Sequence, residues 1–278
     1  YGGEDASPAV YGKVYIAVKP KGNTAFSAAT KDAIKTSILK KTNVVTVTPE
    51  IIDPIFYYLL IDTTINYDPV TLLTNEDTLK SLISSTITNY FSTSLQKFDN
   101  KFRYSKLAGV IDDTNSSIRN SKTSIRYQMQ IAPTTLAVAA TYTMEFNTTL
   151  TKGTLTSTAF TASDGFTYTL IDDSLGNVKL VRSTYTSSTD SVAIDIPTTY
   201  MTLPSGSQNL GTIDYTTGKV VLNSFTPYTI SDGKTYIKMT VTPGTNNQDI
   251  TPLREQIITT DSTDTAAINI TMVAETII

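Results

Sequence analysis

The spacing of apolar residues changes near residue 132, and this change predicts two modules. Before it, stretches in which apolar residues recur every second position alternate with stretches of helical spacing. After it the period is two almost throughout, so we expect strands and no helix before the C-terminus. We therefore predict an α+β protein: a small mixed α/β layer module over residues 1–132, followed by a threonine-rich, all-β, sandwich-like module over residues 133–278.

The first module is predicted to run β-α-β-β-α-α-β, with its helices on one face of a small sheet. Pro49 and Pro54 are expected to break the chain after the second strand, because proline cannot donate to a sheet ladder. The third strand is apolar on both sides, which indicates an interior strand of a covered sheet. Strands are expected at 11–20, 43–48, 55–67 and 124–131, and helices at about 28–41, capped by Ser27, and at 104–111.

The longest predicted helix lies between the third strand and the helix at 104–111. Thr74 and Asp77 are spaced like a capping box at its start. Its apolar stripe is either a face that covers the sheet, which we favour, or a docking face for a partner helix. The stripe consists of Leu79, Leu82, Ile83, Ile87, Tyr90, Phe91, Leu95 and Phe98.

Glycine- and aspartate-containing turns separate the short strands of the second module, as in a sandwich or a barrel. The stretch Leu253–Ile258 fits either a helical turn or a strand. The strands are expected at 142–150, 166–172, 178–182, 192–196, 211–214, 219–222 and 234–241.

The C-terminus is predicted to form an apolar strand that needs a partner. An exposed apolar edge invites aggregation, so we expect this strand to pair within the sandwich or against another subunit. The candidate interface residues are Ile268, Ile270 and Met272, which alternate, and Ile277 and Ile278, which end the chain.

Histidine, cysteine and tryptophan are absent, and only 17% of the residues are charged. Without histidine and cysteine the chain has no Ser-His-Asp or Cys-His system, imidazole or thiolate metal ligand, or disulfide. The loop Asp172–Asn177 superficially resembles a calcium loop, but Ser183 stands where an EF-hand needs glutamate, so a hairpin turn is predicted. We expect no enzyme, and no catalytic, cofactor-binding or metal-ligating residue.

The charge pattern argues against nucleic acid and membranes as partners. The net charge of −3 divides into +3 before Ala132, from 15 basic and 12 acidic residues, and −6 after it, from 7 and 13. No basic stripe for phosphate and no apolar run of about 20 residues is present. We also expect no small-molecule substrate. Because Tyr1 is not an initiator methionine, the sequence is expected to be part of a longer protein.

Two groups of motifs resemble the baseplate wedge proteins of contractile-tailed phages. The first runs from Gly2-Gly3-Glu4-Asp5 through Ser7-Pro8 and Val10-Tyr11-Gly12-Lys13-Val14 to Pro49-Glu50-Ile51-Ile52-Asp53-Pro54 and Tyr67-Asp68-Pro69. The second is Gly211-Thr212-Ile213-Asp214-Tyr215 with Gly218-Lys219-Val220. The resemblance is to the C-terminal part of the gene-product-six family of T-even phages and, more distantly, to the baseplate J-like family.

This resemblance implies a structural virion protein of the tail baseplate, assembled late in infection in the host bacterial cytoplasm. Members of the family form homodimers that join into a ring around the tail hub. They hold other wedge proteins and couple baseplate rearrangement to sheath contraction. The alternative from composition is a threonine-rich bacterial surface adhesin or pilin module. Such modules carry Lys–Asn isopeptide bonds, so intact mass separates the two readings.

Overall fold

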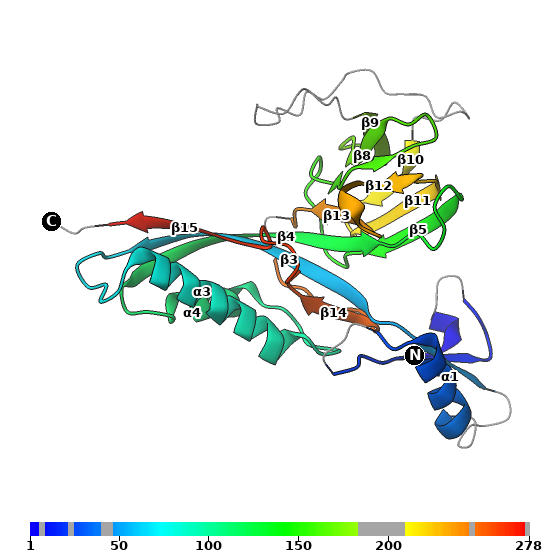
Figure 1. Cartoon of the computed structure of the whole chain (residues 1–278), viewed down its shortest axis with the longest axis horizontal. Helices are drawn as coiled ribbons and strands as arrows, with labels where there is room; N and C mark the ends of the chain where they lie inside the picture. The colour runs from blue at the N-terminus through cyan, green and yellow to red at the C-terminus, as the bar shows by residue number, and fades with distance from the viewer. Residues whose placement is uncertain (6–8, 22–24, 40–46, 183–208, 245–247, 276–278) are drawn as a thin grey trace.

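The structure is a computed structural model that describes residues 1–5, 9–21, 25–39, 47–182, 209–244 and 248–275. Figure 1 shows a long arm of strands with helices along one face, a β-rich body beside the base of the arm, and a small N-terminal unit. Most of the regular structure is β with few helices, which agrees with the predicted α+β class. The sandwich-like layout and the boundary at residue 132 stay predictions.

The helices are α1 (Ala28–Ile34), α3 (Glu76–Tyr90) and α4 (Tyr104–Asp112), with shorter helical turns η1 (Gly3–Asp5), η2 (Lys35–Leu39), η3 (Phe91–Leu95) and η4 (Ser231–Gly233). The strands are β1 (Lys13–Ala17), β2 (Thr48–Ile52), β3 (Ile55–Tyr67), β4 (Ile118–Ile131), β5 (Ala140–Glu145), β6 (Thr156–Ser157), β7 (Phe160–Thr161), β8 (Thr167–Asp172), β9 (Asn177–Arg182), β10 (Asn209–Asp214), β11 (Lys219–Phe225), β12 (Thr229–Ile230), β13 (Ile237–Val241), β14 (Gln256–Thr259) and β15 (Ile268–Ala274).

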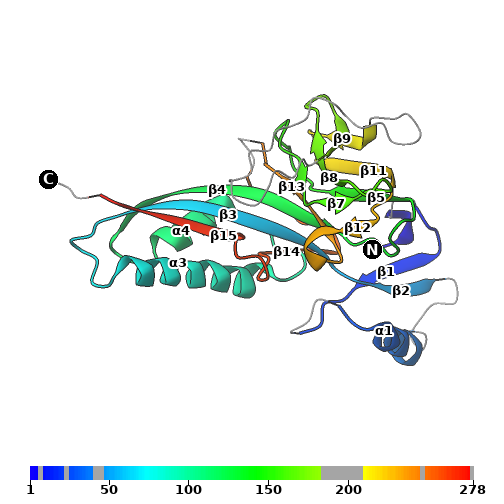
Figure 2. The same cartoon turned by 45° about the horizontal axis from the view of Figure 1, so that its top comes forward.

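In the N-terminal unit, β1 and β2 form a parallel pair and α1 lies beside them (Figure 2). Ser27 caps α1 as predicted, since its side-chain oxygen accepts from Thr30 N at 3.2 Å. The prediction that Pro49 breaks the second strand is wrong, because Pro49 lies inside β2. Thr48 N donates to Gly12 O, so the neighbouring nitrogen of Pro49 points away from β1, where no ladder bond is lost.

The arm consists of β3, β4 and β15, with α3 and α4 covering one face (Figures 1 and 2). The covering role of the α3 stripe is confirmed, since Leu79, Ile83 and Ile87 are at most 1% exposed. The N-cap is Asn75, whose side chain accepts from Thr78 N at 2.7 Å. The expected capping box one residue earlier is therefore wrong.

The interior position predicted for the third strand is confirmed. Strand β3 pairs with β4 on one side and with β14 and then β15 on the other. Its side chains Tyr57, Leu59, Ile61 and Ile65 are fully buried in the core. Helix α3 starts beside the end of β3, where Tyr67 Oη donates to Glu76 Oε2 at 2.7 Å. From there the helix runs back along the arm (Figure 1).

Strand β4 connects the arm to the β-rich body. Its first part pairs with β3 and its last part, Tyr127–Ile131, pairs with β13. From β13 the sheet continues in the order β6-β8-β9-β10-β11-β5. An isolated bridge between Leu150 and Pro243 brings the chain after β5 back toward β13, so the sheet curls on itself. The hydrogen-bonded sheet thus crosses the predicted boundary at residue 132.

The C-terminal strands also return to the first module. Strand β14 resolves the ambiguity at Leu253–Ile258 in favour of a strand, and β15 is parallel to β3 in continuous register from Ile268↔Ile61 to Ala274↔Tyr67. The expectation that β15 pairs within the sandwich is therefore wrong, because its partner is β3. Pairing there buries Ile270 in the core of the arm. The predicted strand at 192–196, together with Pro8, Ile277 and Ile278, lies outside the described residues.

Candidate assembly surface

The outer edge of β15 carries unpaired backbone groups. In the described structure β15 pairs with β3 on one side only. Ile61 N donates to Ala267 O and Glu275 N donates to Tyr67 O, both at 2.8 Å, so the odd-numbered residues of this segment face β3. Alternate residues of a strand direct their N–H and C=O to opposite edges. The backbone N–H and C=O groups of Ile268, Ile270, Met272 and Ala274 therefore face outward.

This edge has none of the usual protection against pairing with another chain. Natural edge strands are shortened, bulged, or marked by proline or charge. Strand β2 carries Pro49, and β5, at the other end of the long sheet, carries Glu145. Strand β15 has seven residues, no proline, no charged residue and no break in register. It is thus a ready template for one more strand.

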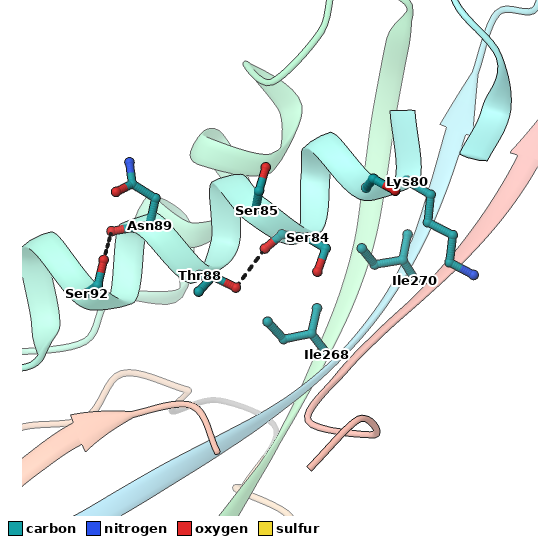
Figure 3. Close-up of a pocket in the computed structure, with 9 residues that line it drawn as sticks. Lys80, Ser84, Ser85, Thr88, Asn89, Ser92, Ile268 and Ile270 are labelled. Carbon is teal, nitrogen blue, oxygen red and sulfur yellow. Dashed lines mark hydrogen bonds between the residues drawn. The ribbon is translucent and has the colours of Figure 1, made fainter. Parts of the chain in front are cut away.

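A groove of about 740 Å³ runs beside this edge, between β15 and α3 (Figure 3). The helix contributes small hydroxyl side chains, and two of them turn back to their own helix: Thr88 Oγ1 donates to Ser84 O at 2.9 Å and Ser92 Oγ to Asn89 O at 3.0 Å. These side chains leave space above the strand. The lining residues are Lys80, Ser81, Ser84, Ser85, Thr88, Asn89, Ser92, Ile268 and Ile270.

The apolar face of β15 is committed to the arm itself. Ile270 is 4% exposed, and Ile268 and Met272 are half-buried against the core beneath α3. The opposite face carries Asn269 and Val273, which are exposed. Three of the candidate interface residues, Ile268, Ile270 and Met272, therefore lie on β15, but most of their side-chain surface is already covered. Their role in an interface stays a prediction, and the sequence held no signal for the free backbone edge.

The face of the arm that α3 and α4 leave open is polar. Arg126 pairs with Asp62 at 3.0 Å, and Asn269 Nδ2 donates to the same carboxylate at 3.2 Å. Further along the arm Asn66 Nδ2 donates to Asn120 Oδ1 at 2.9 Å. These ion pairs and side-chain hydrogen bonds satisfy the polar groups of this face, as is typical of a face exposed to solvent. The open edge, rather than this face, is the part of the arm that lacks partners.

The glycines of the motifs are needed by the backbone. A Cβ on Gly3 would lie 1.8 Å from Val10 O, and one on Gly211 would lie 2.0 Å from Val221 O. Gly12 and Gly218 adopt φ angles of 77° and 73°, which favour glycine. These positions therefore fix turns and close chain contacts.

The remaining motif residues are also structural. Gly2 forms an isolated bridge with Val14. Pro54 is buried between β2 and β3, and Pro69 is exposed in the turn after β3. Together with Pro49 in β2, they shape the path from the N-terminal unit into the arm. None of them lies in the groove beside β15.

The carboxylates at Asp172 and Asp173 form a hairpin turn, as predicted, and their oxygens are occupied. Asp172 accepts from Gly153 N at 2.6 Å, Leu155 N at 2.8 Å and Tyr215 Oη at 2.6 Å. Burial raises the pKa of Asp173, but bonds from Asn177, Leu175 and Lys179 outweigh it and hold this pKa well below its usual range. Among the described residues no group of acidic side chains is arranged to hold a metal ion.

A buried charge cluster fixes the loop between β14 and β15. Lys238 Nζ on β13 lies 3.0 Å from Asp261 Oδ2 and 2.5 Å from Asp264 Oδ2. The side chains of Lys238 and Asp261 are 13% and 5% exposed. This ion cluster ties the start of the C-terminal strand to the β-rich body. The sequence analysis did not predict this cluster, because Lys238 is far in sequence from Asp261 and Asp264 and no local sequence pattern links them.

The helices in the described ranges do not include one that is both long and apolar enough to cross a membrane. This finding concerns helices alone.

Comparison with known proteins matches the N-terminal unit and the arm. Residues 1–52 match the family "Baseplate structural protein gp6, C-terminal domain I", and residues 55–129 match "Baseplate structural protein gp6, C-terminal domain III". A curated relative, the baseplate wedge protein gp6 of Enterobacteria phage T4, is 27% identical over 120 residues. That alignment covers 43% of this chain and 18% of the relative, so the chain spans less than a fifth of that protein.

These matches define what the chain is similar to: structural proteins of phage tail baseplates. The first matched segment ends at the end of β2, and the second runs from β3 through α3 and α4 into β4. Over these two segments the chain is similar to gp6-like baseplate wedge proteins, and the resemblance of the first group of motifs is confirmed. The motif at Gly211 and Gly218 lies outside both matched segments and stays a prediction.

Proposed function

We propose that this chain is a structural part of a baseplate wedge in the virion of a contractile-tailed phage. In this proposal it forms homodimers that join into a ring around the tail hub, contacts other wedge proteins, and couples baseplate rearrangement to sheath contraction. It acts without substrate, cofactor, nucleic acid or membrane. The observation that carries the proposal is the pair of gp6 family matches over the N-terminal unit and the arm.

The architecture supports a role in assembly. The arm is stiffened by a 13-residue and a 14-residue strand that pair along most of their length, and by two helices packed on one face. Such an arm holds its shape when it is loaded at one end, because its apolar face is closed and its open face is polar. Its uncovered strand edge offers a directional attachment point. Rigid elements with one open edge are suited to building a symmetric ring.

Loss of the chain from the phage that encodes it tests the proposal. A nonsense codon early in the gene should give tails without complete baseplates under a nonsuppressing host, as seen by electron microscopy. Growth in a suppressor host is the matched control and should restore them. Gold-labelled antibody to the chain should bind the end of the tail away from the head. Intact, contractile tails in the absence of the chain would contradict the proposal.

The adhesin alternative has one observation in its favour. Asp173 accepts from Asn177 Nδ2 at 2.7 Å and pairs with Lys179 Nζ at 3.1 Å, so a lysine, an asparagine and an acid meet as isopeptide chemistry requires. However, Asn177 and Lys179 both belong to β9 and are two residues apart. A bond between them would join no separate strands and would add little strength. An intact mass lower by one ammonia would nevertheless support this reading, and an unmodified mass weakens it.

A further inference from the structure

In the described structure the outer edge of β15 pairs with no other strand, and the strand has no charged residue that would repel a second copy of itself. We infer that β15 pairs with β15 of a second copy, antiparallel and about a twofold axis at Thr271, so that two arms share one continuous sheet. This inference rests on the proposed homodimer and names its interface. It commits to a second copy because the edge pattern is self-complementary, as the register shows.

Backbone geometry requires a register whose twofold axis passes through a residue rather than between two residues. The outward N–H and C=O groups belong to even-numbered residues, so even must meet even across the axis. Centring on Thr271 achieves this and uses the whole of Ile268–Ala274. Ile268 then lies opposite Ala274 of the second copy, and Ile270 opposite its Met272, as hydrogen-bonded pairs. Thr271 meets its own copy in a non-hydrogen-bonded pair.

The side chains agree with this register on both faces. Directly opposed residues of a sheet point to the same face. On the helix side the pairs are Ile268–Ala274 and Ile270–Met272, which are apolar. On the open side Thr271 meets Thr271, a favourable cross-strand pair, and Asn269 meets Val273. No charged residue of either strand is brought against another, since β15 has none.

The groove beside β15 supplies room for the added strand. The partner's Met272 would point to the helix side next to Ile270, which lines the groove. The small hydroxyl residues of α3 keep about 740 Å³ open there, and an apolar side chain entering it covers Ile268 and Ile270. By the twofold symmetry each copy fills the groove of the other. A groove and a free edge side by side thus fit one occupant.

Opposite charges at the axis test the pairing. Thr271→Asp and Thr271→Lys each place like charges face to face, which should weaken dimerisation at least about fivefold in sedimentation velocity over a concentration series. An equimolar mixture of the two variants should restore dimers as heterodimers. Ser124→Asp and Ser124→Lys are matched controls, because Ser124 is exposed on the same face on β4, two strands from the edge. They should dimerise like the wild type.

Cysteine pairs test the register, since the chain has no cysteine of its own. Cα atoms of a non-hydrogen-bonded antiparallel pair lie about 4.5 Å apart, within the roughly 4.4–6.8 Å that a disulfide spans. Thr271→Cys should form a disulfide dimer on mild oxidation. Asn269→Cys and Val273→Cys should each form little alone and form one when mixed. Equal cross-linking of Asn269→Cys alone would overturn the register.

The outcomes separate this inference from the proposed function. A wild-type dimer that is insensitive to all Thr271 changes overturns the β15 interface and leaves the homodimer proposal standing. A wild-type chain that remains monomeric at every concentration overturns both. Recovery of dimers in the mixed Thr271→Asp and Thr271→Lys sample supports the interface directly, because loss of folding in either variant could not produce it.

Discussion

The buried charge cluster at Lys238 gives the sharpest test of how the C-terminal strand is held in place. Lys238→Met removes the ammonium that lies between Asp261 and Asp264 while keeping a side chain of similar length. Asp261 Oδ2 is buried and lies 3.0 Å from this ammonium, which compensates its charge. The loop that carries both carboxylates connects β14 to β15. The substitution therefore weakens the attachment of β15, the strand that we propose as the interface.

The expected cost is about 3 kcal/mol of unfolding free energy at pH 7. Removing one partner of a buried ion pair costs roughly 3–5 kcal/mol, because the other charge stays buried without compensation. Asp261 is 5% exposed and belongs to this regime. Asp264 is 26% exposed and can turn toward water, so the lower end of the range applies.

The cost should depend on pH in a defined direction. Burial raises the pKa of Asp261, but bonds from Thr263 and Lys238 outweigh burial, so the pKa of this carboxyl lies below its usual 3.8. The bond from Lys238 is the main cause that lowers the pKa of Asp264. Carboxylates with lowered pKa values stabilise the fold above 3.8, and this contribution is lost as the pH falls through the folded values. The difference between wild type and Lys238→Met should therefore shrink below pH 3.8.

The upper pH limit of the stabilisation by this cluster is set by Lys238. Burial lowers the pKa of Lys238, but the bonds that its ammonium donates to Asp264 and Asp261 outweigh burial, so this pKa lies above the usual 10.5. A group whose pKa is raised on folding stabilises the fold below its unfolded value, and the stabilisation is lost as the pH rises through the folded value. The cluster thus contributes fully between about pH 4 and pH 10.

Urea unfolding monitored by tyrosine fluorescence at pH 7 and pH 3 measures these differences. Lys219→Met is the matched control, because Lys219 lies 3.8 Å from Glu145 and both side chains are at least 40% exposed. Its cost should be below about 1 kcal/mol. The reasoning is refuted if Lys238→Met costs no more than the control, or if its cost at pH 3 equals that at pH 7.

Three further predictions concern the fold. Ile83→Ala should cost about 3 kcal/mol in urea unfolding, because Ile83 is fully buried on the face of α3 that covers the sheet, whereas Leu82→Ala, at 43% exposure, should cost less than about 1 kcal/mol; equal costs would contradict the covering role of the helix. Gly211→Ala should lower the midpoint of thermal unfolding by several degrees, because its Cβ would meet Val221 O at 2.0 Å; an unchanged midpoint would show that β10 shifts freely. Asp172→Asn should cost about 2 kcal/mol in urea, since its buried carboxylate accepts bonds that an amide cannot all keep; calcium-dependent stability of the wild type would show instead that this loop binds metal.

Local patterns predicted most elements of the arm. The period of the stripe from Leu79 to Leu95 indicated a helix on a sheet, and the double-sided apolar pattern of Ile55–Tyr67 indicated an interior strand. Both inferences depend on residues close in sequence, where spacing alone decides which side chains share a face. Element ends were less accurate: β4 begins at Ile118, six residues before the predicted start at Ser124. Polar residues on its solvent face hid the earlier half of the strand.

Local patterns did not predict which strands pair. The alternation of Ile268, Ile270 and Met272 indicated a strand with one apolar face, but the same alternation fits the sandwich, a second subunit or β3. The prediction for Pro49 was wrong for the same reason. Proline is excluded from a strand only where the neighbouring strand needs its backbone N–H as a donor, and β2 has no neighbouring strand on that side among the described residues. Pairing depends on which edge is free in three dimensions.

The sequence by itself determined which residue types are missing, the resemblance of residues 1–52 and 55–129 to gp6, and the class of most elements, because these depend on composition, short motifs and local periodicity. The tertiary structure decided that β14 and β15 return to β3, that Lys238 bridges two distant carboxylates, and that one uncharged strand edge stays open. These features join residues far apart in the chain, and their free energy comes from burial and pairing that exist only in the folded protein.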